Sequence, residues 1–398
     1  MKILHVIPAV APRYGGPSSS IVSMCRALAA HGVEPTLVAT DADGTGRLDV
    51  PLDEPTTWQG VNARFFARQF SEAFKYSRPL AAWLDRNVRD FSVVHVHGVL
   101  SHASLAAARA ATKHDVPYII RPLGTLDPWS LAQKSGRKRL LMRTGVTRLL
   151  RHASAIHYTS AEEQRSVERT LGLARGVVIP LGVDAAALAG EQLTDAARAP
   201  HRYVLALSRL HPVKNLEALV EAFADVHAGA AGWTLTIAGS GDDEYAATLR
   251  EAVERRHVGD RVMLAGWVDG TAKQHLVGRA SVFALPSFHE NFGVSLVEAM
   301  AAGVPALVSR DVHLAEDINA AGAGWIVSPD RVAIAAGLRE AMTDSDERAK
   351  KGQAASRLAA RFAWPIVAGS LKALYERLTP RGSSEVEDET LGAGVSRA

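Results

Sequence analysis

The chain has 398 residues, which is long enough for two domains, and its 47% apolar and 22% charged content is typical of a globular protein. The net charge of +3 is small for this length and argues against a general nucleic-acid-binding protein. The single cysteine, Cys25, excludes an intrachain disulfide and suits a reducing cytosol. We expect neither a signal peptide nor a membrane span, because a strand pattern starts at residue 3 and no apolar run reaches membrane length. A cytoplasmic protein is therefore expected.

The first half of the chain alternates short β-rich runs with amphipathic stretches. The expected strands cover residues 3–7, 36–39, 61–66, 93–97, 118–121, 155–158 and 177–180. A first helix is expected after the loop at 8–17 and ends near residue 31. The other expected helices cover residues 79–88, 101–114, 134–152 and 161–171. This alternation predicts a doubly wound α/β domain.

The second half restarts the same alternation. Residues 185–200 are rich in Ala and acidic residues and predict a linker between domains at 1–184 and 201–364. The expected strands cover residues 203–207, 234–238, 261–264, 281–285, 305–308 and 325–327. The expected helices cover residues 215–227, 244–257, 271–279, 294–302 and 313–321, and three more helical stretches end near residue 378. The tail at 380–398 is rich in Gly, Ser and Glu and is predicted to be disordered.

The loops after the strands are the places to search for a site, because ligands of open α/β sheets bind beyond the carboxyl ends of the strands. The first such loop contains Gly15 and Gly16, which allow a ligand to approach the backbone at a helix start. It lacks the Gly-x-Gly-x-x-Gly pattern, which argues against a dinucleotide-dependent dehydrogenase. Taken alone, the pair is better interpreted as a plain turn.

The strand at 93–97 ends in two histidines, His95 and His97, which share a face because they are two residues apart. They could be a metal pair, but no third ligand has a recognisable spacing. We favour one packing histidine and one at the sheet edge, with His97 at the mouth of the cleft because Gly98 ends the strand.

The strand at 203–207 leads into Arg209 and Lys214, just before a helix. Two cations together with helix N–H groups predict an anion site, and two solvated cations are the alternative. The later Gly239-Ser240-Gly241 run is weak evidence for anything beyond a tight turn.

Two carboxylates flank the start of the apolar helix at 294–302. Glu290 lies in the preceding loop, and Glu298 is the only charged residue of the helix. Burying a carboxylate is costly without hydrogen-bond donors around it, so both glutamates are candidates for binding ligand hydroxyls. The alternative is that Glu290 complements the helix dipole and Glu298 faces solvent.

Together and in this order, these features resemble the retaining nucleotide-sugar glycosyltransferases of family 4, which have the GT-B architecture. The resemblance covers nearly the whole chain, from residue 1 to about 378. Its most specific marks are Glu290 with Glu298, which is similar to the family's Glu-x7-Glu element, and Arg209 with Lys214-Asn215. Supporting marks are Gly15-Gly16, His97-Gly98 and the run at 179–184, in which Leu181 replaces the usual Asn.

The resemblance implies a role for each matching residue. Arg209 and Lys214 would bind the donor diphosphate, and Gly15 and Gly16 would offer backbone N–H groups to the same phosphates. Glu290 would hold hydroxyls of the donor sugar, Glu298 would accept from the ribose, and His97 would lie against the transferred sugar. The expected catalytic set is His97, Arg209, Lys214 and Glu290.

Further donor contacts are implied for the loop that starts the helix and for one turn after a strand. The backbone of Asn291, Phe292, Gly293 and Val294 would meet the sugar and phosphate. The backbone of Trp267 and Val268 would contact the nucleobase. Neither a metal nor another cofactor is expected, because the cations and a helix N-terminus stabilise the leaving group's charge. Such enzymes are often described as using front-face attack, and we name no catalytic base.

The resemblance also predicts how the C-terminal segment and the acceptor side are built. Residues 365–379 would cross back and pack on the first domain, so that two Rossmann-like domains close over the donor. The stretch 134–152 is basic and interleaved with apolar residues, and it could rest on an anionic membrane surface at the inner face of the plasma membrane. The alternative is a buried apolar face with a solvated basic face. Arg121 and Trp129 are weaker candidates for acceptor contacts.

The function expected from this resemblance is transfer of a sugar from a nucleotide-diphosphate sugar to a glycan or lipid-linked glycan, in the biosynthesis of a cell-surface or exported polysaccharide. One alternative is a GT-B-like sugar-nucleotide epimerase or phosphorylase. Another is a non-catalytic sugar-nucleotide-binding partner of an assembly complex. The donor base, the donor sugar and the linkage cannot be read from these residues.

Overall fold

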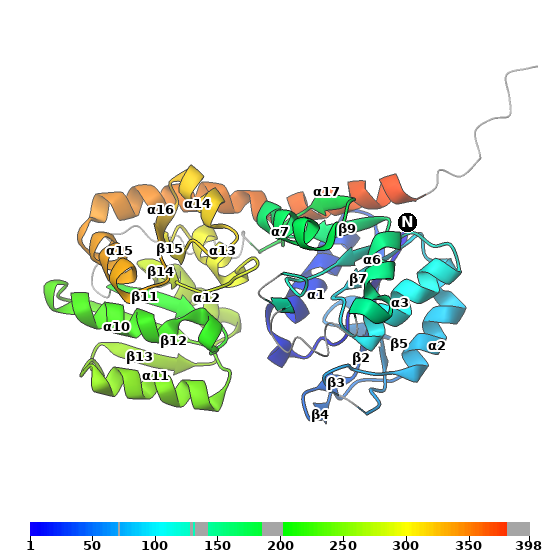
Figure 1. The fold of residues 1–398 in the computed structure, drawn as a ribbon, viewed down its shortest axis with the longest axis horizontal. Helices are drawn as coiled ribbons and strands as arrows, with labels where there is room; N and C mark the ends of the chain where they lie inside the picture. Colours follow the sequence, from blue (N-terminus) through cyan, green and yellow to red (C-terminus); the bar gives the residue numbers. More distant parts are fainter. Residues whose placement is uncertain (71, 128–129, 132–141, 185–201, 380–398) are drawn as a thin grey trace, which may run out of the picture.

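The computed structural model describes residues 1–70, 72–127, 130–131, 142–184 and 202–379. The strands form two large parallel sheets, each covered by helices, which lie side by side along the long axis of the molecule (Figure 1). The predicted α/β architecture with two Rossmann-like domains is therefore confirmed.

The first sheet has the strand order β10-β9-β8-β7-β1-β2-β6-β5. Its strands are β1 (Lys2–Val6), β2 (Glu34–Thr40), β5 (Pro55–Trp58), β6 (Val61–Phe66), β7 (Val93–His97), β8 (Tyr118–Arg121), β9 (Ala155–Tyr158) and β10 (Gly176–Val178). All neighbours pair in parallel except β5, which is antiparallel to β6. The surrounding helices are α1 (Gly16–Ala30), α2 (Arg78–Asn87), α3 (His102–Lys113), α6 (Thr147–His152) and α7 (Ala161–Leu171). A small hairpin of β3 (Ala42–Asp43) and β4 (Gly46–Arg47) lies outside this sheet.

The second sheet has the order β13-β12-β11-β14-β15-β16 and is parallel throughout. Its strands are β11 (Arg202–Leu207), β12 (Trp233–Ala238), β13 (Val262–Gly266), β14 (Val282–Leu285), β15 (Ala306–Ser309) and β16 (Gly324–Val327). Its helices are α10 (Leu216–Val226), α11 (Asp243–Arg255), α12 (Gly270–Arg279), α13 (Val294–Ala301), α14 (Ala315–Ala321), α15 (Arg331–Thr343) and α16 (Ser345–Ala359). Central strands such as β14 are buried along their whole length, as expected for a parallel sheet covered on both faces.

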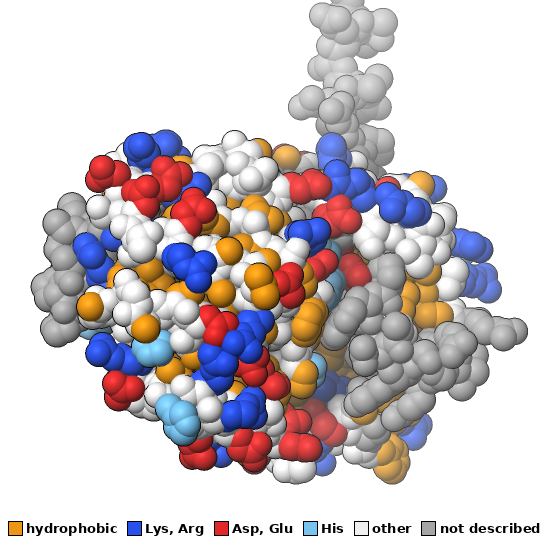
Figure 2. Space-filling model, turned by 60° about the vertical axis from the view of Figure 1, so that its left-hand side comes forward, with side chains coloured by type: hydrophobic (Ala, Val, Ile, Leu, Met, Phe, Trp, Pro, Cys, Tyr) orange, Lys and Arg blue, Asp and Glu red, His pale blue; other side chains and the backbone are white. Residues whose placement is uncertain are grey.

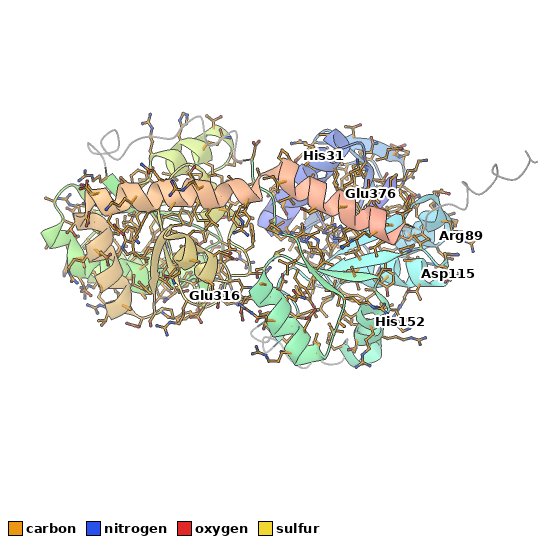
Figure 3. All side chains as sticks on the ribbon, turned by 90° about the horizontal axis from the view of Figure 1, so that it is seen from above. His31, Arg89, Asp115, His152, Glu316 and Glu376 are labelled. Carbon is orange, nitrogen blue, oxygen red and sulfur yellow. The ribbon has the colours of Figure 1, made fainter. Side chains whose placement is uncertain are left out.

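The last helix, α17 (Trp364–Leu378), leaves the second domain and packs on the first (Figure 1). Seen from above, α16 covers the second domain and α17 continues over the first (Figure 3). The apolar face of α17 shares a core with β1 and α1 through Val367, Ala368, Leu371, Leu374 and Tyr375. This confirms the predicted C-terminal crossing. At the crossing, Gly182 lies so close to the Trp364 ring that a Cβ atom would come within 2.2 Å of it, so only glycine fits there.

The element boundaries agree closely with the sequence patterns. Strands β6, β7, β8 and β9 and helix α7 have the predicted bounds, and most other elements differ by one or two residues. The short strands β3, β4 and β5 were not predicted. The predicted linker, the tail and most of the predicted helix at 134–152 lie outside the described residues, and the domain bounds at 184 and 201 stay a prediction.

Among the described residues, no helix is long and apolar enough to cross a membrane. On the face turned forward in Figure 2, basic and acidic side chains are interspersed rather than gathered by sign. The small positive net charge is therefore not concentrated on that face.

Candidate active site

The strand order reverses at an equivalent point in each sheet, and the predicted site residues follow the strands at these two points. In the first sheet the order reverses between β1 and β7, and in the second between β11 and β14. In open α/β sheets such switch points open a crevice beyond the carboxyl ends of the strands. Gly16 follows β1 and His97 ends β7, whereas Lys214 follows β11 and Glu290 follows β14. Topology thus explains why residues so distant in sequence are candidates for one site.

The N-termini of two helices meet where the domains face each other. Helix α1 begins at Gly16 and helix α13 begins at Val294, and a Cβ atom on Gly16 would lie 3.7 Å from Cγ2 of Val294. Each helix start is preceded by a glycine with positive φ, Gly15 at 75° and Gly293 at 76°. Both helix ends carry partial positive charge and free N–H groups, which favours an anion between them.

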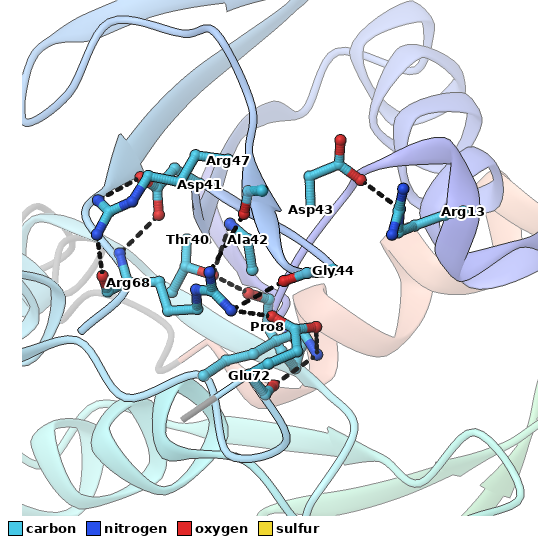
Figure 4. A network of polar contacts seen from close by, with 12 residues as sticks. Pro8, Arg13, Thr40, Asp41, Ala42, Asp43, Gly44, Arg47, Arg68 and Glu72 are labelled. Atoms are coloured by element: carbon cyan, nitrogen blue, oxygen red, sulfur yellow. Dashed lines mark hydrogen bonds and ion pairs between the residues drawn. The ribbon is translucent and has the colours of Figure 1, made fainter. Parts of the chain in front are cut away.

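The loop before Gly15 is held by polar contacts with neighbouring loops (Figure 4). Arg13 forms an ion pair of 2.7 Å with Asp43, and the Tyr14 hydroxyl donates to Glu72 and accepts from Gly44 N at 2.9 Å. Arg68 and Lys75 pair with the same Glu72 carboxylate. These contacts fix the 3₁₀ turn Pro12–Tyr14 and hence the start of α1.

The two predicted charges Lys214 and Glu290 contact each other directly. Lys214 Nζ donates to Glu290 Oε2 at 2.5 Å, and the two side chains are only 11% and 19% exposed. Burial raises the pKa of Glu290, but the Lys214 charge and hydrogen bond, helped by the Phe292 N–H, lower it below its ordinary value. Glu290 is therefore ionised at neutral pH, and Lys214 is not a solvated cation.

The loop that carries Arg209 is shaped by two glycines of the next strand end. Cβ atoms on Gly239 and Gly241 would lie about 2 Å from the backbone oxygens of Ser208 and Leu210, at 1.8 and 2.1 Å. Only glycines allow the two loops to pack so closely, which explains the Gly-x-Gly run without a role in binding. Arg209 is exposed at the end of this loop. The neighbouring Asn215 holds the lysine loop by donating to the carbonyls of Pro286 and Pro329 at 3.1 and 2.7 Å.

Glu298 forms an ion pair that the sequence did not indicate. Lys273 of α12 places its Nζ 2.7 and 2.6 Å from the two carboxylate oxygens, so Glu298 does not simply face solvent. Lys273 carries no local motif, and only the packing of α12 on α13 brings it there. Trp267 is exposed and donates to Asp269 at 3.2 Å, while Val268 packs against the domain core.

The loop residues between the two glutamates have structural contacts of their own. The Asn291 side chain crosses to the first domain and donates to Thr159 Oγ1 at 2.9 Å. Phe292 is buried against Phe362, with ring centroids 5.6 Å apart. Their side chains therefore fix the loop, which leaves their backbone groups for the predicted ligand contacts.

A ladder of buried histidines lies on one face of the first sheet. His157 Nε2 donates to the carbonyl of Ile179 at 2.7 Å, and burial lowers the pKa of His157 to about 3, so the ring is neutral. Its Nδ1 must then accept from His95 Nε2 at 3.2 Å. His95 Nδ1 in turn accepts from the hydroxyl of Tyr375 at 2.8 Å. The Ile179 carbonyl thereby fixes the tautomers of this ladder, and Tyr375 of the crossover helix α17 completes it.

His97 belongs to the same cluster. Its Nε2 lies 3.1 Å from His5 Nδ1, and its ring lies against His95 with centroids 4.3 Å apart. The prediction that only one histidine of the pair packs inside is wrong, because both are buried: His95 lies against Tyr375 of α17, and His97 packs on His5 and His95. Burial, with the charges of His5 and Arg121, holds the pKa of His97 well below its usual range. His97 Nδ1 has no hydrogen-bond partner among the described residues.

Arg121 stands beside His97 on the neighbouring strand and is also buried. Burial lowers its pKa to about 10, although Glu163 opposes this, so the guanidinium is charged at neutral pH. Its Nε and Nη2 have no hydrogen-bond partner among the described residues. Because Arg121 is buried, an acceptor substrate could reach its side chain, as predicted from the sequence, only if the cleft rearranged.

Two groups of side chains in the described part of the chain could hold a metal. His5 supplies the third nitrogen next to His95 and His97; its strand was predicted, but no spacing in the sequence linked it to the other two histidines. That group already hydrogen-bonds internally and adjoins the Arg121 charge, which disfavours a cation. The second group, Asp127, His289 and His313, bridges the two domains. Trp129 and residues 134–141 lie outside the described residues, so their predicted roles stay predictions.

Comparison with known proteins gives this geometry a context. Residues 15–182 match the family described as Glycosyl transferase 4-like domain, and residues 195–358 match Glycosyl transferases group 1. The chain is 26% identical to the GDP-mannose:cellobiosyl-diphosphopolyprenol alpha-mannosyltransferase of Komagataeibacter xylinus, over 99% of this chain and 97% of that protein. It is 29% identical to the protein of the same name from Xanthomonas oryzae pv. oryzae, over 93% of this chain and 95% of that protein.

A solved structure has the same fold. The crystal structure of Anabaena Alr3699/HepE in complex with UDP and glucose matches with a TM-score of 0.75 at 19% identity, over 95% of this chain and 100% of that chain. At this identity the likeness establishes the shared two-domain fold alone.

Proposed function

We propose that this chain, which belongs to the family 4 glycosyltransferases of GT-B fold, transfers mannose from GDP-mannose to a glycan carried on polyprenyl diphosphate. The observation that carries this choice of substrates is the similarity, over nearly the full length, to mannosyltransferases named for that donor and that kind of acceptor. The product would be an intermediate in the assembly of a cell-surface or exported polysaccharide.

The donor diphosphate would lie between the starts of α1 and α13. Breaking the sugar–phosphate bond leaves negative charge on the diphosphate and positive charge on the sugar. Two helix N-termini, the exposed Arg209 and the buried Lys214 would stabilise the first charge. The catalysis we propose needs no metal ion, because these groups already supply positive charge where negative charge develops on the diphosphate.

The carboxylates would hold the two sugars of the donor. Glu290, ionised and paired with Lys214, would accept hydrogen bonds from hydroxyls of the mannose. Glu298, paired with Lys273, would accept from the ribose, and the backbone near Trp267 and Val268 would contact the base. His97 would orient the transferred sugar through its Nδ1, which needs a shift of the buried ring toward the cleft. The anomeric configuration would be retained, without a nucleophile from the enzyme.

The acceptor's lipid would bring the enzyme to the cytoplasmic face of a membrane. Residues 134–152 would face the anionic surface, and the described part of this stretch exposes Arg148 and Arg151 on α6. Replacing Lys134, Arg137, Lys138 and Arg139 by Gln should reduce co-sedimentation with vesicles that contain anionic lipid. Unchanged co-sedimentation would contradict this part of the proposal.

The substrates can be tested by incubating the full-length protein with a short-chain polyprenyl-diphosphate disaccharide and one nucleotide sugar at a time. We expect a mannosylated lipid product with GDP-mannose, detected by mass spectrometry, and an unchanged rate in EDTA. Transfer from a UDP-sugar but not from GDP-mannose would overturn the proposed donor. Epimerised or phosphorolysed donor without transfer would favour the alternative activities instead.

A further inference from the structure

We propose that Asp127, His289 and His313 form a tetrahedral transition-metal site, suited to Zn²⁺, that joins the two domains. Asp127 follows β8 in the first domain, whereas His289 follows β14 and His313 follows β15 in the second. The site is therefore complete only when the domains are in contact. It adjoins Glu290, whose carbonyl accepts from the His313 N–H at 3.0 Å, but the diphosphate chemistry proposed above uses no metal.

The spacing of the ligand atoms supports this assignment. One oxygen or nitrogen from each of the three side chains lies within 4.8 Å of the other two. Asp127 Oδ2 lies 3.4 Å from His313 Nε2, which is long for a direct hydrogen bond. Two ligands bound at roughly 2.0–2.1 Å to a tetrahedral zinc lie about 3.3 Å apart. The carboxylate and imidazole already have the separation that a shared ion requires.

The chemistry of the donor set also suits a borderline metal. Neutral imidazole and carboxylate are common zinc ligands, and three protein ligands leave one position for water. The side chains of Asp127 and His313 are only 8% and 7% exposed, so a cation between them would offset the cost of burying the carboxylate.

Ser160 provides the outer partner that metal-binding histidines usually have. Its Oγ accepts from Glu163 N at 3.0 Å as the cap of α7, and it lies 3.3 Å from His313 Nδ1. In the tautomer in which His313 Nδ1–H donates to Ser160 Oγ, the lone pair of Nε2 is free to bind the metal.

The surroundings hold the three ligands close together. Asn291 of the second domain bonds to Thr159 of the first at 2.9 Å, and Arg165 of α7 pairs with Glu316 of α14 at 2.8 Å. Glu316 lies at the junction of the two domains when the molecule is seen from above (Figure 3). A metal at this place would add a stronger link and would hold the domains in the contact seen in the structure.

Cobalt titration of the tag-free, metal-stripped full-length protein tests the proposal, because tetrahedral Co²⁺ has intense visible d–d absorption. We expect one Co²⁺ per chain with such a spectrum, displaced by Zn²⁺, and a higher melting temperature with Zn²⁺. His313→Ala and His289→Ala should each weaken binding by more than about 100-fold. His152→Ala, which removes an exposed histidine of α6, is the matched control and should bind normally.

Circular dichroism and metal-free melting show whether each variant is folded, and His313→Gln provides a second variant that keeps the polar contact with Ser160. Equal binding by the folded His313 variants and the parent would overturn the proposal, as would a weak octahedral spectrum. Because these readouts need no transfer, they fail independently of the proposed mannosyltransferase activity. Loss of Zn²⁺ stabilisation in Asp127→Asn would show that the first domain contributes a ligand.

Discussion

Replacing Lys214 by Met removes the positive partner of Glu290 while keeping the length of the side chain. The pair is short, at 2.5 Å, and both side chains are mostly buried. Removing one member of a buried ion pair costs about 3–5 kcal/mol, because the other charge stays buried without compensation. Glu290 is 19% exposed and can take up a proton, so we expect a loss of about 3 kcal/mol in the free energy of unfolding.

The double variant Lys214→Met with Glu290→Gln separates stability from activity. It removes both charges, so the loss in the free energy of unfolding should fall below about 1.5 kcal/mol. Transfer should stay strongly reduced in both variants, because the phosphate and sugar contacts are lost. Lys113→Met is the matched control, since its pair with Asp85 is exposed to solvent and should contribute little to stability.

Urea unfolding followed by circular dichroism measures these differences, with the transition of the second domain fitted separately. Equal losses in Lys214→Met and Lys113→Met would refute the idea of a buried charge pair. Full transfer activity in the double variant would refute the place of the Lys214–Glu290 pair in the active site.

Three further results are expected. Gly16→Ala should leave stability within about 0.5 kcal/mol, because the new Cβ has room, but should raise the donor KM by crowding the phosphates; an unchanged KM in steady-state kinetics would contradict this. Gly182→Ala should lower the melting temperature in differential scanning fluorimetry, because its Cβ would clash with the Trp364 ring, and a melting temperature like that of the parent would speak against the packed crossing. Burial lowers the pKa of His5 and of His157 to about 3, so below pH 6.5 the unfolded chain binds more protons than the folded protein. The free energy of unfolding should therefore fall as pH falls from 6.5, by up to about 1.4 kcal/mol per pH unit for each ring. Urea midpoints that stay flat between pH 7 and 5 would contradict this.

The sequence predicted the fold well because the strong signals are local. The strands at 93–97 and 118–121 are continuous buried runs, and their bounds were found without error. The strand Pro55–Trp58 was missed because it is a short, partly exposed edge strand that begins with a proline. Its pairing with the next strand, rather than its composition, makes it a strand.

The site was predicted only in part, for the same reason. The spacing of Glu290 and Glu298 marked them as candidates, but their partners are set by tertiary contacts. Lys273 comes from a helix without a motif, and His5 is separated from His97 by 92 residues. Burial of the histidine cluster could not be read from the strand pattern, because Tyr375 of α17, which packs against His5 and His95, arrives from the far end of the chain.

The most direct test of the account is a crystal structure of the full-length protein with GDP. The account predicts that the diphosphate lies between Gly16 and Val294, with phosphate oxygens about 2.7–3.2 Å from Lys214 Nζ and from backbone N–H groups at the start of α13. It also predicts that Glu298 accepts from the ribose. A diphosphate bound elsewhere, without contact to Lys214 or to either helix start, would contradict the central claim.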